Sequence, residues 1–322
     1  MRCRTLGNTE LSISEIGFGA WGAGGAQWRG VPSEECAAAI RCGLELGINF
    51  IDTALAYGDG HSERLIGKVL KTWPRPAVIA TKVPPLNRIW PAPDTARIDE
   101  VFPWQHVIHS TEESLRNLGV ERIDLQQLHV WNSHWTQKEE WRRAFEALKQ
   151  SGKVRFVGIS LTEHDPDSGI ALVESGLVDA LQVIYNIFDP SAADHLFPLA
   201  MQKGVGIIAR VPLDEGGLTA TIDESTKFEK DDFRATYFRG ERRRQLAKHV
   251  DALQHDLRNT SGSLPEIAIR FCLSHPVVTS VIPGMRRRRH VESNVRAAAT
   301  GPLPSETLDL LKRHAWKRSF YS

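Results

Sequence analysis

Short apolar runs alternate with amphipathic segments along most of this chain. Each run is predicted to be a strand, and the segment after it carries apolar residues at the spacing of a helix. The predicted strands cover residues 13–18, 50–52, 77–82, 123–129, 154–160, 180–185, 205–210 and 277–282. The predicted helices are one from Ser33 to Gly47, one capped by Ser62, and those at 104–118, 138–150, 168–174, 192–202, 241–257, 265–274, 291–299 and 305–314.

This alternation predicts an α/β fold with a parallel sheet that is buried on both faces. Eight strand–helix units without an interrupting linker favour a closed (β/α)8 TIM barrel, formed as one domain by residues 1–322. The turn at 6–9 predicts an N-terminal hairpin before the barrel. The stretch 214–239 is a long loop after the seventh strand and a candidate lid, and a helix is expected near the C-terminal end.

Composition excludes several classes of function. The 322 residues carry a net charge of +1, so no overall field favours nucleic acid or a membrane surface. The four cysteines show no paired spacing, which argues against a disulfide framework and against a metal site. The N-terminal residues lack the apolar core of a signal peptide, and no apolar run approaches the length of a membrane span. We therefore expect a cytoplasmic protein.

Four polar residues fall at or just after the ends of neighbouring predicted strands: Asp52, Tyr57, Lys82 and His129. Lys82 and Asp52 are expected to form a buried ion pair, because neither charge is stable alone in a barrel mouth. The ammonium would then lower the pKa of Tyr57 from about 10, so that its phenol can give a proton to a carbonyl oxygen. His129 could donate a hydrogen bond to the same oxygen. Any one of these residues alone would be interpreted as structural; together they favour an active site.

Several separated motifs carry a resemblance to a known family. They are 47–54 (Gly-Ile-Asn-Phe-Ile-Asp-Thr-Ala) with 57–60 and 62–63, then 115–118 with 123–125 and 128–129, then 152–155 with 158–160, and Gln182 with 185–186. In this order they resemble the aldo-keto reductase superfamily over nearly the whole chain. In that family the residues matching Asp52, Tyr57, Lys82 and His129 are the catalytic tetrad, with the tyrosine as general acid.

The resemblance also implies NADP(H), with NAD(H) as a second possibility, held in an extended pose over the barrel mouth. Gly17, Gly19 and Gly22 spell a dinucleotide fingerprint, but no helix follows them to aim its N-terminus at a pyrophosphate, so we reject that interpretation. The basic stretch 282–290 leads into a helix and predicts an anion site; a solvated basic patch is the alternative. The expected cofactor contacts there are Gly284, Arg286 on the 2′-phosphate, His290 and Asn294.

The nicotinamide end departs from the family pattern. Leu161 stands where many members carry an Asn for the carboxamide, which leaves Ser160 and Gln182 for that task. Arg210 stands where many members have an aromatic residue, and Pro212 and Leu213 follow it as further expected cofactor contacts. The guanidinium of Arg210 could stack on the nicotinamide, or it could bind an anionic group of the substrate. Both interpretations stay open.

The expected substrate is a small molecule, namely an aldehyde, a ketone or a sugar hydroxyl. Trp21, Trp28, Trp90 and Trp131 fall in or beside predicted mouth loops and could wall its pocket, although packing explains such residues equally well. The sequence thus predicts an NADP(H)-dependent oxidoreductase, as a monomer or small homo-oligomer. A cofactor-bound regulatory or scaffold barrel, or an epimerase that works through a transient ketone, are the alternatives.

Overall fold

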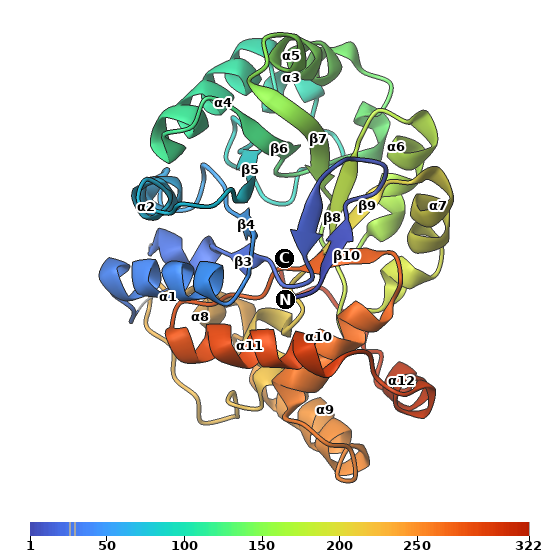
Figure 1. The fold of residues 1–322 in the computed structure, drawn as a ribbon. Coiled ribbons are helices and arrows are strands. Elements are labelled where there is room, and N and C mark those ends of the chain that lie inside the picture. Colours follow the sequence, from blue (N-terminus) through green and yellow to red (C-terminus); the bar gives the residue numbers. More distant parts are fainter. Residues whose placement is uncertain (26, 29, 322) are drawn as a thin grey trace.

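Eight parallel strands form one curled sheet in the computed structural model, which describes residues 1–25, 27, 28 and 30–321 (Figure 1). The strands are hydrogen-bonded in the order β10-β9-β8-β7-β6-β5-β4-β3. Single parallel bridges from Ile16 to Val281 and from Gly19 to Gly284 join the two edges. The predicted (β/α)8 barrel is confirmed. Its strands are β3 (Phe18–Gly19), β4 (Phe50–Asp52), β5 (Val78–Val83), β6 (Ile123–Leu128), β7 (Val154–Ser160), β8 (Ala180–Ile184), β9 (Gly206–Arg210) and β10 (Val278–Val281).

Helices surround the sheet and follow its strands along the chain (Figure 1). They are α1 (Ser33–Glu45), α2 (His61–Leu70), α3 (Ile98–Val101), α4 (Trp104–Leu118), α5 (Glu139–Gln150), α6 (Ile170–Ser175), α7 (Leu196–Lys203), α8 (Phe233–Tyr237), α9 (Arg242–Asp256), α10 (Leu264–Ser274), α11 (Arg288–Thr300) and α12 (Ser305–Lys312). The sequence located the longer of these well, because their apolar stripes face the sheet. The predicted lid contains the short helix α8 and, before it, a kinked 3-10 segment at Asp214–Thr219.

An antiparallel hairpin, β1 (Cys3–Thr5) with β2 (Ser12–Ser14), lies in front of the barrel in Figure 1. Its apolar residues Leu11 and Ile13 pack against Phe50 and other side chains inside the barrel. The predicted first strand, 13–18, is therefore wrong in its extent. Ile13 belongs to the hairpin cluster, whereas Phe18 belongs to the shell of apolar residues between sheet and helices. The apolar run 13–18 is thus divided between strand β2 of the hairpin and strand β3 of the barrel.

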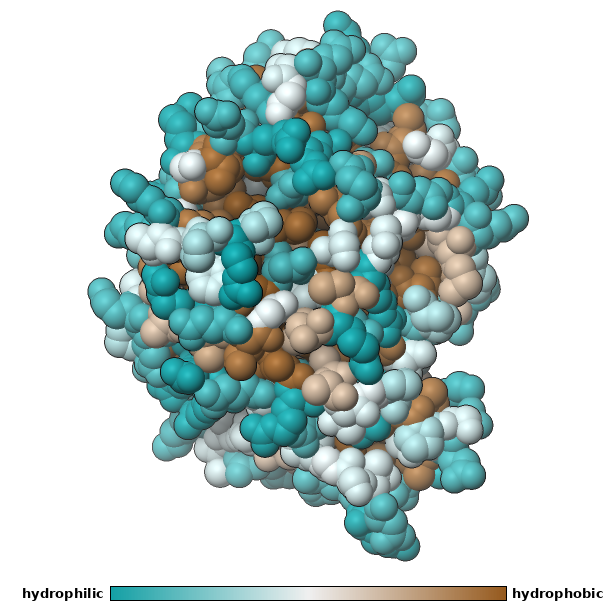
Figure 2. Space-filling model, in the orientation of Figure 1, coloured by the Kyte–Doolittle hydropathy of each residue, from teal (hydrophilic) through white to brown (hydrophobic). Residues whose placement is uncertain are grey.

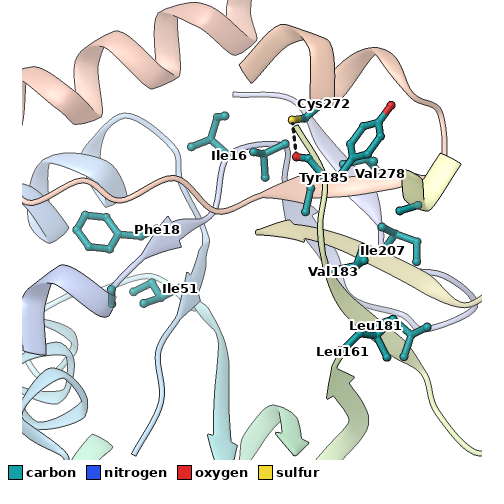
Figure 3. Packing of buried hydrophobic residues seen from close by; sticks show 14 of the residues in the cluster. Ile16, Phe18, Ile51, Leu161, Leu181, Val183, Tyr185, Ile207, Cys272 and Val278 are labelled. Atoms are coloured by element: carbon teal, nitrogen blue, oxygen red, sulfur yellow. Dashed lines mark hydrogen bonds between the residues drawn. The ribbon is translucent and has the colours of Figure 1, made fainter. Parts of the chain in front are cut away.

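The main core lies between the sheet and its helices. Figure 3 shows part of it, where Phe18 and Ile51 lie toward one end and Val183 and Ile207 toward the other. The Sγ–H of Cys272 donates to the carbonyl oxygen of Tyr185 at 3.1 Å, so this cysteine is a packing residue. In the view of Figure 2 polar side chains cover most of the outer rim. Among the described residues, no helix is long and apolar enough to cross a bilayer.

Strand register brings polar side chains to one end of the barrel. Asp52 lies opposite Ala80, and Lys82 lies opposite Gln127 on the next strand. Ser160 lies opposite Gln182. All of these polar residues are buried. Because parallel strands all end on the same side, this polar layer sits at the carboxyl end of the barrel, where TIM-barrel active sites are built.

The turn after β4 is held by two close contacts. Helix α2 begins at His61 after Gly60, whose φ is 76°, so the prediction that Ser62 caps it is wrong. The Ser62 hydroxyl instead accepts from Thr53 Oγ1 at 2.9 Å and donates to the carbonyl oxygen of Ala20 at 3.0 Å. A Cβ on Gly58 would lie 2.2 Å from the carbonyl oxygen of Gly24. These contacts fix the turn that carries Tyr57.

Helix α2 packs so closely on the end of α4 that it requires a glycine. A Cβ on Gly67 would lie 2.6 Å from the carbonyl oxygen of Leu118. Gly67→Ala should therefore lower the free energy of unfolding by about 2 kcal/mol, even though alanine favours the helix by about 1 kcal/mol. Urea denaturation measures the change. Gly43→Ala in α1 is the control, because its nearest contact would be the flexible Ile48 side-chain end at 3.3 Å. Equal stability of Gly67→Ala and wild type would contradict the packing argument.

Candidate active site

A buried ion pair lies at the centre of the site. The ammonium Nζ of Lys82 is 2.6 Å from Asp52 Oδ1 and also donates to the carbonyl oxygen of Thr53 at 2.8 Å. The Lys82 side chain is 0% exposed and that of Asp52 is 3% exposed. Burial lowers the pKa of Lys82, while the charge of Asp52 acts in the opposite direction. Charges this deep are stable only with close partners, and the predicted pair is present.

The second oxygen of Asp52 is held by two glutamine side chains. Gln182 Nε2 donates to Asp52 Oδ2 at 2.7 Å, and Gln127 Nε2 lies 3.5 Å from the same atom. Gln182 therefore points its amide N–H groups toward Asp52, and the carboxamide contact expected from the sequence stays a prediction. Gln127 was missed. Its strand, β6, also contains Asp124 and Gln126, so the sequence does not mark which of these polar residues faces Asp52. Ser160 is buried at the end of β7, beside Gln182.

The Tyr57 hydroxyl lies against the ammonium, 3.4 Å from Lys82 Nζ. Burial raises the pKa of Tyr57 well above its ordinary value, and the charge of Asp52 raises it further, while Arg210 opposes them. The expected lowering of this pKa is wrong for the protein without cofactor. Asp52 balances the charge of Lys82, so desolvation of the phenolate dominates. The phenol is therefore protonated at neutral pH and available as a proton donor.

His129 follows β6 and completes the predicted group of four. Its ring centroid lies 5.5 Å from that of Tyr57, edge to face, and 5.9 Å from that of Trp90. Burial lowers the pKa of His129 well below its ordinary value, and the positive charges of Lys82 and Arg210 act in the same direction. The imidazole is therefore neutral. Its Nδ1 is buried without a hydrogen-bond partner among the described residues, so one ring nitrogen can serve a ligand.

Arg210, at the end of β9, is held by two groups of the loop after β7. Its Nη2 donates to the carbonyl oxygen of Leu161 at 3.1 Å and lies 3.5 Å from Glu163 Oε1. The positive charge of Arg210 opposes the rise in the pKa of Tyr57 and adds to the fall in the pKa of His129. Glu163 was missed by the sequence analysis, since a single acid in a loop carries no recognisable pattern. The guanidinium thus has a carboxylate partner within the chain itself.

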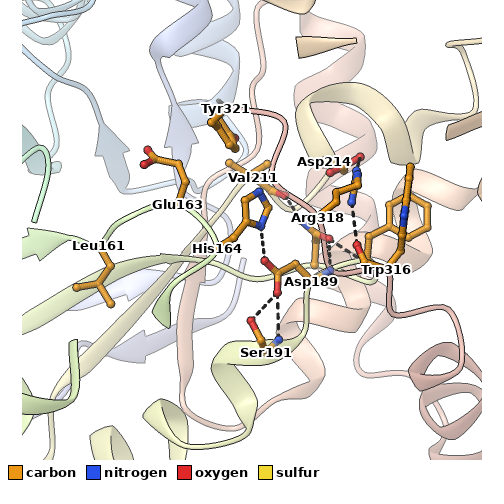
Figure 4. Close-up of polar contacts among 12 residues, drawn as sticks. Leu161, Glu163, His164, Asp189, Ser191, Val211, Asp214, Trp316, Arg318 and Tyr321 are labelled. Carbon is orange, nitrogen blue, oxygen red and sulfur yellow. Dashed lines mark hydrogen bonds and ion pairs between the residues drawn. The ribbon is translucent and has the colours of Figure 1, made fainter. Parts of the chain in front are cut away.

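The loop after β9 contains two neighbouring buried acids, Asp214 and Glu215. Both contact the tail segment, which we define as residues 316–321; Figure 4 shows Asp214 beside Arg318. Arg318 pairs with Asp214, and the Tyr321 hydroxyl donates to Glu215 Oε1 at 2.5 Å. Burial raises the pKa of Glu215 to about 7. Pro212 and Leu213, the predicted cofactor contacts, directly precede these acids.

The basic turn after β10 fits the adenosine end of a dinucleotide. A Cβ on Gly284 would meet no atom within 4 Å, so open space lies beside its backbone. The amide Nδ2 of Asn294 is buried without a partner among the described residues. Arg286 is half-buried, runs across Gly22 and places its guanidinium 5.5 Å from the ring of Trp28. His290 is also half-buried. These residues could hold an anionic, aromatic ligand.

The four predicted pocket tryptophans divide into two groups. Trp21 stacks toward Tyr57 with 6.2 Å between ring centroids and contacts Phe233 of the lid at 4.9 Å. Trp28 contacts Trp21 edge-on at 5.4 Å, and Trp90 is exposed beside His129. Trp131 differs: it is 1% exposed and packs edge-on against two other core tryptophans. Its predicted place in the pocket wall is therefore corrected to one in the core.

A hollow of about 320 Å³ opens at the other end of the barrel, between Asn8 and Lys203. It lies beside the hairpin turn, far from the strand ends that carry Asp52 and Lys82. In barrels of this kind the amino-terminal face contributes stability. The mouth at the carboxyl end, crossed by the lid and the tail segment, is therefore the candidate active site.

The raised pKa of Glu215 makes stability depend on pH. A carboxyl whose pKa rises from 4.5 to about 7 on folding contributes stability below pH 4.5 and loses it as the pH rises through about 7. The loss amounts to about 3 kcal/mol. Between pH 5 and pH 8, Glu215→Gln should therefore lose less free energy of unfolding than wild type, as measured by urea denaturation across that range. Identical pH profiles for the two proteins would refute the assignment.

Comparisons with known proteins agree with this geometry. A model of the Aldo/keto reductase family matches residues 15–315. The chain is 28% identical over 304 residues to "Aldo-keto reductase YhdN" of Bacillus subtilis (strain 168), covering 91% of this chain and 87% of that protein. It is 27% identical over 306 residues to "NADH-specific methylglyoxal reductase" of Escherichia coli (strain K12), covering 91% of this chain and 92% of that protein.

The fold is shared with solved relatives as well. The structure of the glycerol dehydrogenase AKR11B4 from Gluconobacter oxydans matches with a TM-score of 0.79 and 27% sequence identity, covering 98% of this chain and 97% of that one. The family model spans nearly all of the barrel, and the named relatives are oxidoreductases. The chain belongs to the aldo/keto reductase family.

Proposed function

We propose that this protein is an NADP(H)-dependent oxidoreductase that interconverts a carbonyl and an alcohol on an aldehyde, a ketone or a sugar. The observation that supports this most is the Tyr57 hydroxyl, which lies 3.4 Å from a lysine ammonium that is itself paired with Asp52. A protonated phenol next to a buried cation is suited to give up its proton when negative charge develops on a substrate oxygen.

The chain's own residues supply the proton and the orientation. Reduced nicotinamide supplies a hydride to the carbonyl carbon when it is bound. The Tyr57 hydroxyl donates its proton to the carbonyl oxygen, and the ammonium of Lys82 stabilises the phenolate that remains. Asp52 keeps Lys82 charged, and neutral His129 donates a hydrogen bond that orients the same oxygen. Solvent then returns a proton to Tyr57. Alcohol oxidation uses these steps in reverse.

The choice of NADP(H) is supported by Arg286. A half-buried guanidinium beside open backbone at Gly284 suits the 2′-phosphate that distinguishes NADP(H) from NAD(H). The unpartnered amide of Asn294 suits an acceptor on the adenine. One relative is named as specific for NADH, so use of NAD(H) remains the alternative within the proposal.

Replacing the proton donor tests the chemistry. Tyr57→Phe should lower kcat for carbonyl reduction by at least about a hundredfold, because the general acid is lost. Cofactor affinity should stay near that of wild type. Tyr185→Phe is the control, since that ring packs against Phe197 and Phe271 in the core. Normal turnover by Tyr57→Phe would remove Tyr57 from its role. Cofactor binding without turnover of any carbonyl by wild type would favour the regulatory barrel instead.

Replacing the phosphate contact tests the cofactor assignment. Arg286→Ala should weaken binding of NADPH by about tenfold or more and leave that of NADH nearly unchanged, because only NADPH carries the 2′-phosphate. Isothermal titration calorimetry with each cofactor gives the ratio. Arg288→Ala is the control, since that side chain is exposed and pairs with Glu292 at 2.8 Å. Equal weakening of both cofactors would sink the assignment of Arg286.

A further inference from the structure

The tail segment binds the loop after β9 through side chains buried on both sides (Figure 4). The backbone N–H of Trp316 donates to the carbonyl oxygen of Phe188 at 2.8 Å, which fixes the start of the tail segment. Arg318 Nη2 lies 2.5 Å from Asp214 Oδ2, and the two side chains are 7% and 2% exposed. Tyr321 holds Glu215 three residues later. Each of the two neighbouring acids thus has its own partner in the tail segment.

Arg318 is rigidly placed. Its guanidinium carbon lies 3.9 Å from the ring centroid of Trp316 and 4.7 Å from that of Phe320. These aromatic contacts and the ion pair at the tip hold the side chain in place. Asp214 is equally confined, because a Cβ on Gly217 would lie 2.4 Å from its Oδ2. The pair is therefore a built contact between two segments that are distant in sequence.

The loop that these contacts hold has an uncommon backbone. Val211, Asp214 and Glu215 have φ values of 55°, 51° and 53°, in the left-handed region that side chains disfavour. Each such residue costs about 1–2 kcal/mol, so the conformation persists only when its surroundings impose it. Asn186 Nδ2 donates to the carbonyl oxygen of Val211 at 2.9 Å. The tail segment holds the other two residues through their side chains.

The ion pair between Arg318 and Asp214 also affects the charge that an anionic cofactor would meet at this loop. Pro212 and Leu213, which we assign to the cofactor, are directly followed by the two acids. Ionised carboxylates at this position would repel the phosphates of a dinucleotide. Arg318 cancels the charge of Asp214, and Tyr321 donates to Glu215. The chain therefore supplies its own cation to Asp214, the acid that directly follows the expected cofactor contacts.

We propose that Arg318 is a positioning residue for the anionic dinucleotide: by pairing with Asp214 it neutralises the carboxylate that directly follows Pro212 and Leu213, the expected cofactor contacts. Arg318 acts through Asp214 and touches no reacting atom, so it sets cofactor affinity and leaves the chemical step alone. The inference rests on the proposed function, because it needs a phosphate-bearing cofactor on this loop.

Charge rescue in the full-length protein tests the inference. Isothermal titration calorimetry with NADPH at pH 8, where an unpaired Asp214 is most fully ionised, should give Arg318→Met about tenfold weaker binding than wild type. The double variant Arg318→Met/Asp214→Asn should return to within about threefold of wild type, because the Asp214 carboxylate no longer repels the phosphates. At saturating cofactor, kcat should change less than twofold by the same reasoning.

Two further variants separate this role from a merely structural one. Arg313→Met removes an exposed arginine that pairs only loosely with Asp256, at 4.0 Å, and should bind NADPH as wild type does. Asp214→Asn alone leaves Arg318 as an uncompensated cation and should bind NADPH at least as tightly as wild type. This variant gives an independent result if Arg318→Met unfolds, which its thermal melt would reveal.

The contradicting outcomes are distinct. Wild-type affinity in Arg318→Met, a double variant no better than the single one, or a tenfold loss in Asp214→Asn would each overturn the inference while leaving the proposed function intact. Failure of wild type to bind either NADPH or NADH would overturn the proposed function and this inference together.

Discussion

The structure of the site depends on one buried interaction, the ion pair between Lys82 and Asp52. A charge without a partner at this depth would cost several kcal/mol, so each must be close to the other and to further polar groups. The carbonyl oxygen of Thr53 completes the shell of Lys82, and Gln182 completes that of Asp52. These residues come from three strands of the barrel. A slip of one residue in any of them would turn a polar side chain out of the barrel and leave its partner unpaired. The ion pair therefore constrains strand register, and it also places the cation beside Tyr57.

Strand ends explain why the centre of the site could be predicted from the sequence. Asp52, Lys82 and His129 each stand at the end of a predicted strand, and adjacent parallel strands must bring such ends together. Properties set by burial could not be predicted in this way. The pKa of Tyr57 rises because its phenolate would be desolvated, and no local pattern reports how deeply a turn is covered. Trp131 shows the same limit: the sequence suggested a place in the pocket wall, but the side chain is buried in the core.

The contacts of the tail segment lay beyond sequence reasoning for another reason. Arg318 and Asp214 are 104 residues apart, and neither belongs to a periodic element that would predict its direction. Asp214 and Glu215 directly follow the expected cofactor contacts, where negative charge is unfavourable for an anionic ligand. The arginine that pairs with Asp214 could be located only in the structure. The left-handed backbone at Asp214 and Glu215 was hidden as well, because non-glycine residues give no sign that they will adopt it. The centre of the site thus follows from strand order, whereas its outer supports follow from loops.

The central claim is that Lys82 acts on the reaction through Tyr57, and a double-mutant cycle on carbonyl reduction tests it most directly. The rates of wild type, Lys82→Met, Tyr57→Phe and the double variant would be compared at saturating cofactor and substrate, with folding checked for each. Groups that work as one unit give strongly non-additive losses. We predict that the double variant is about as slow as the slower single variant. Losses that simply multiply would show that Lys82 and Tyr57 act independently and would contradict the account.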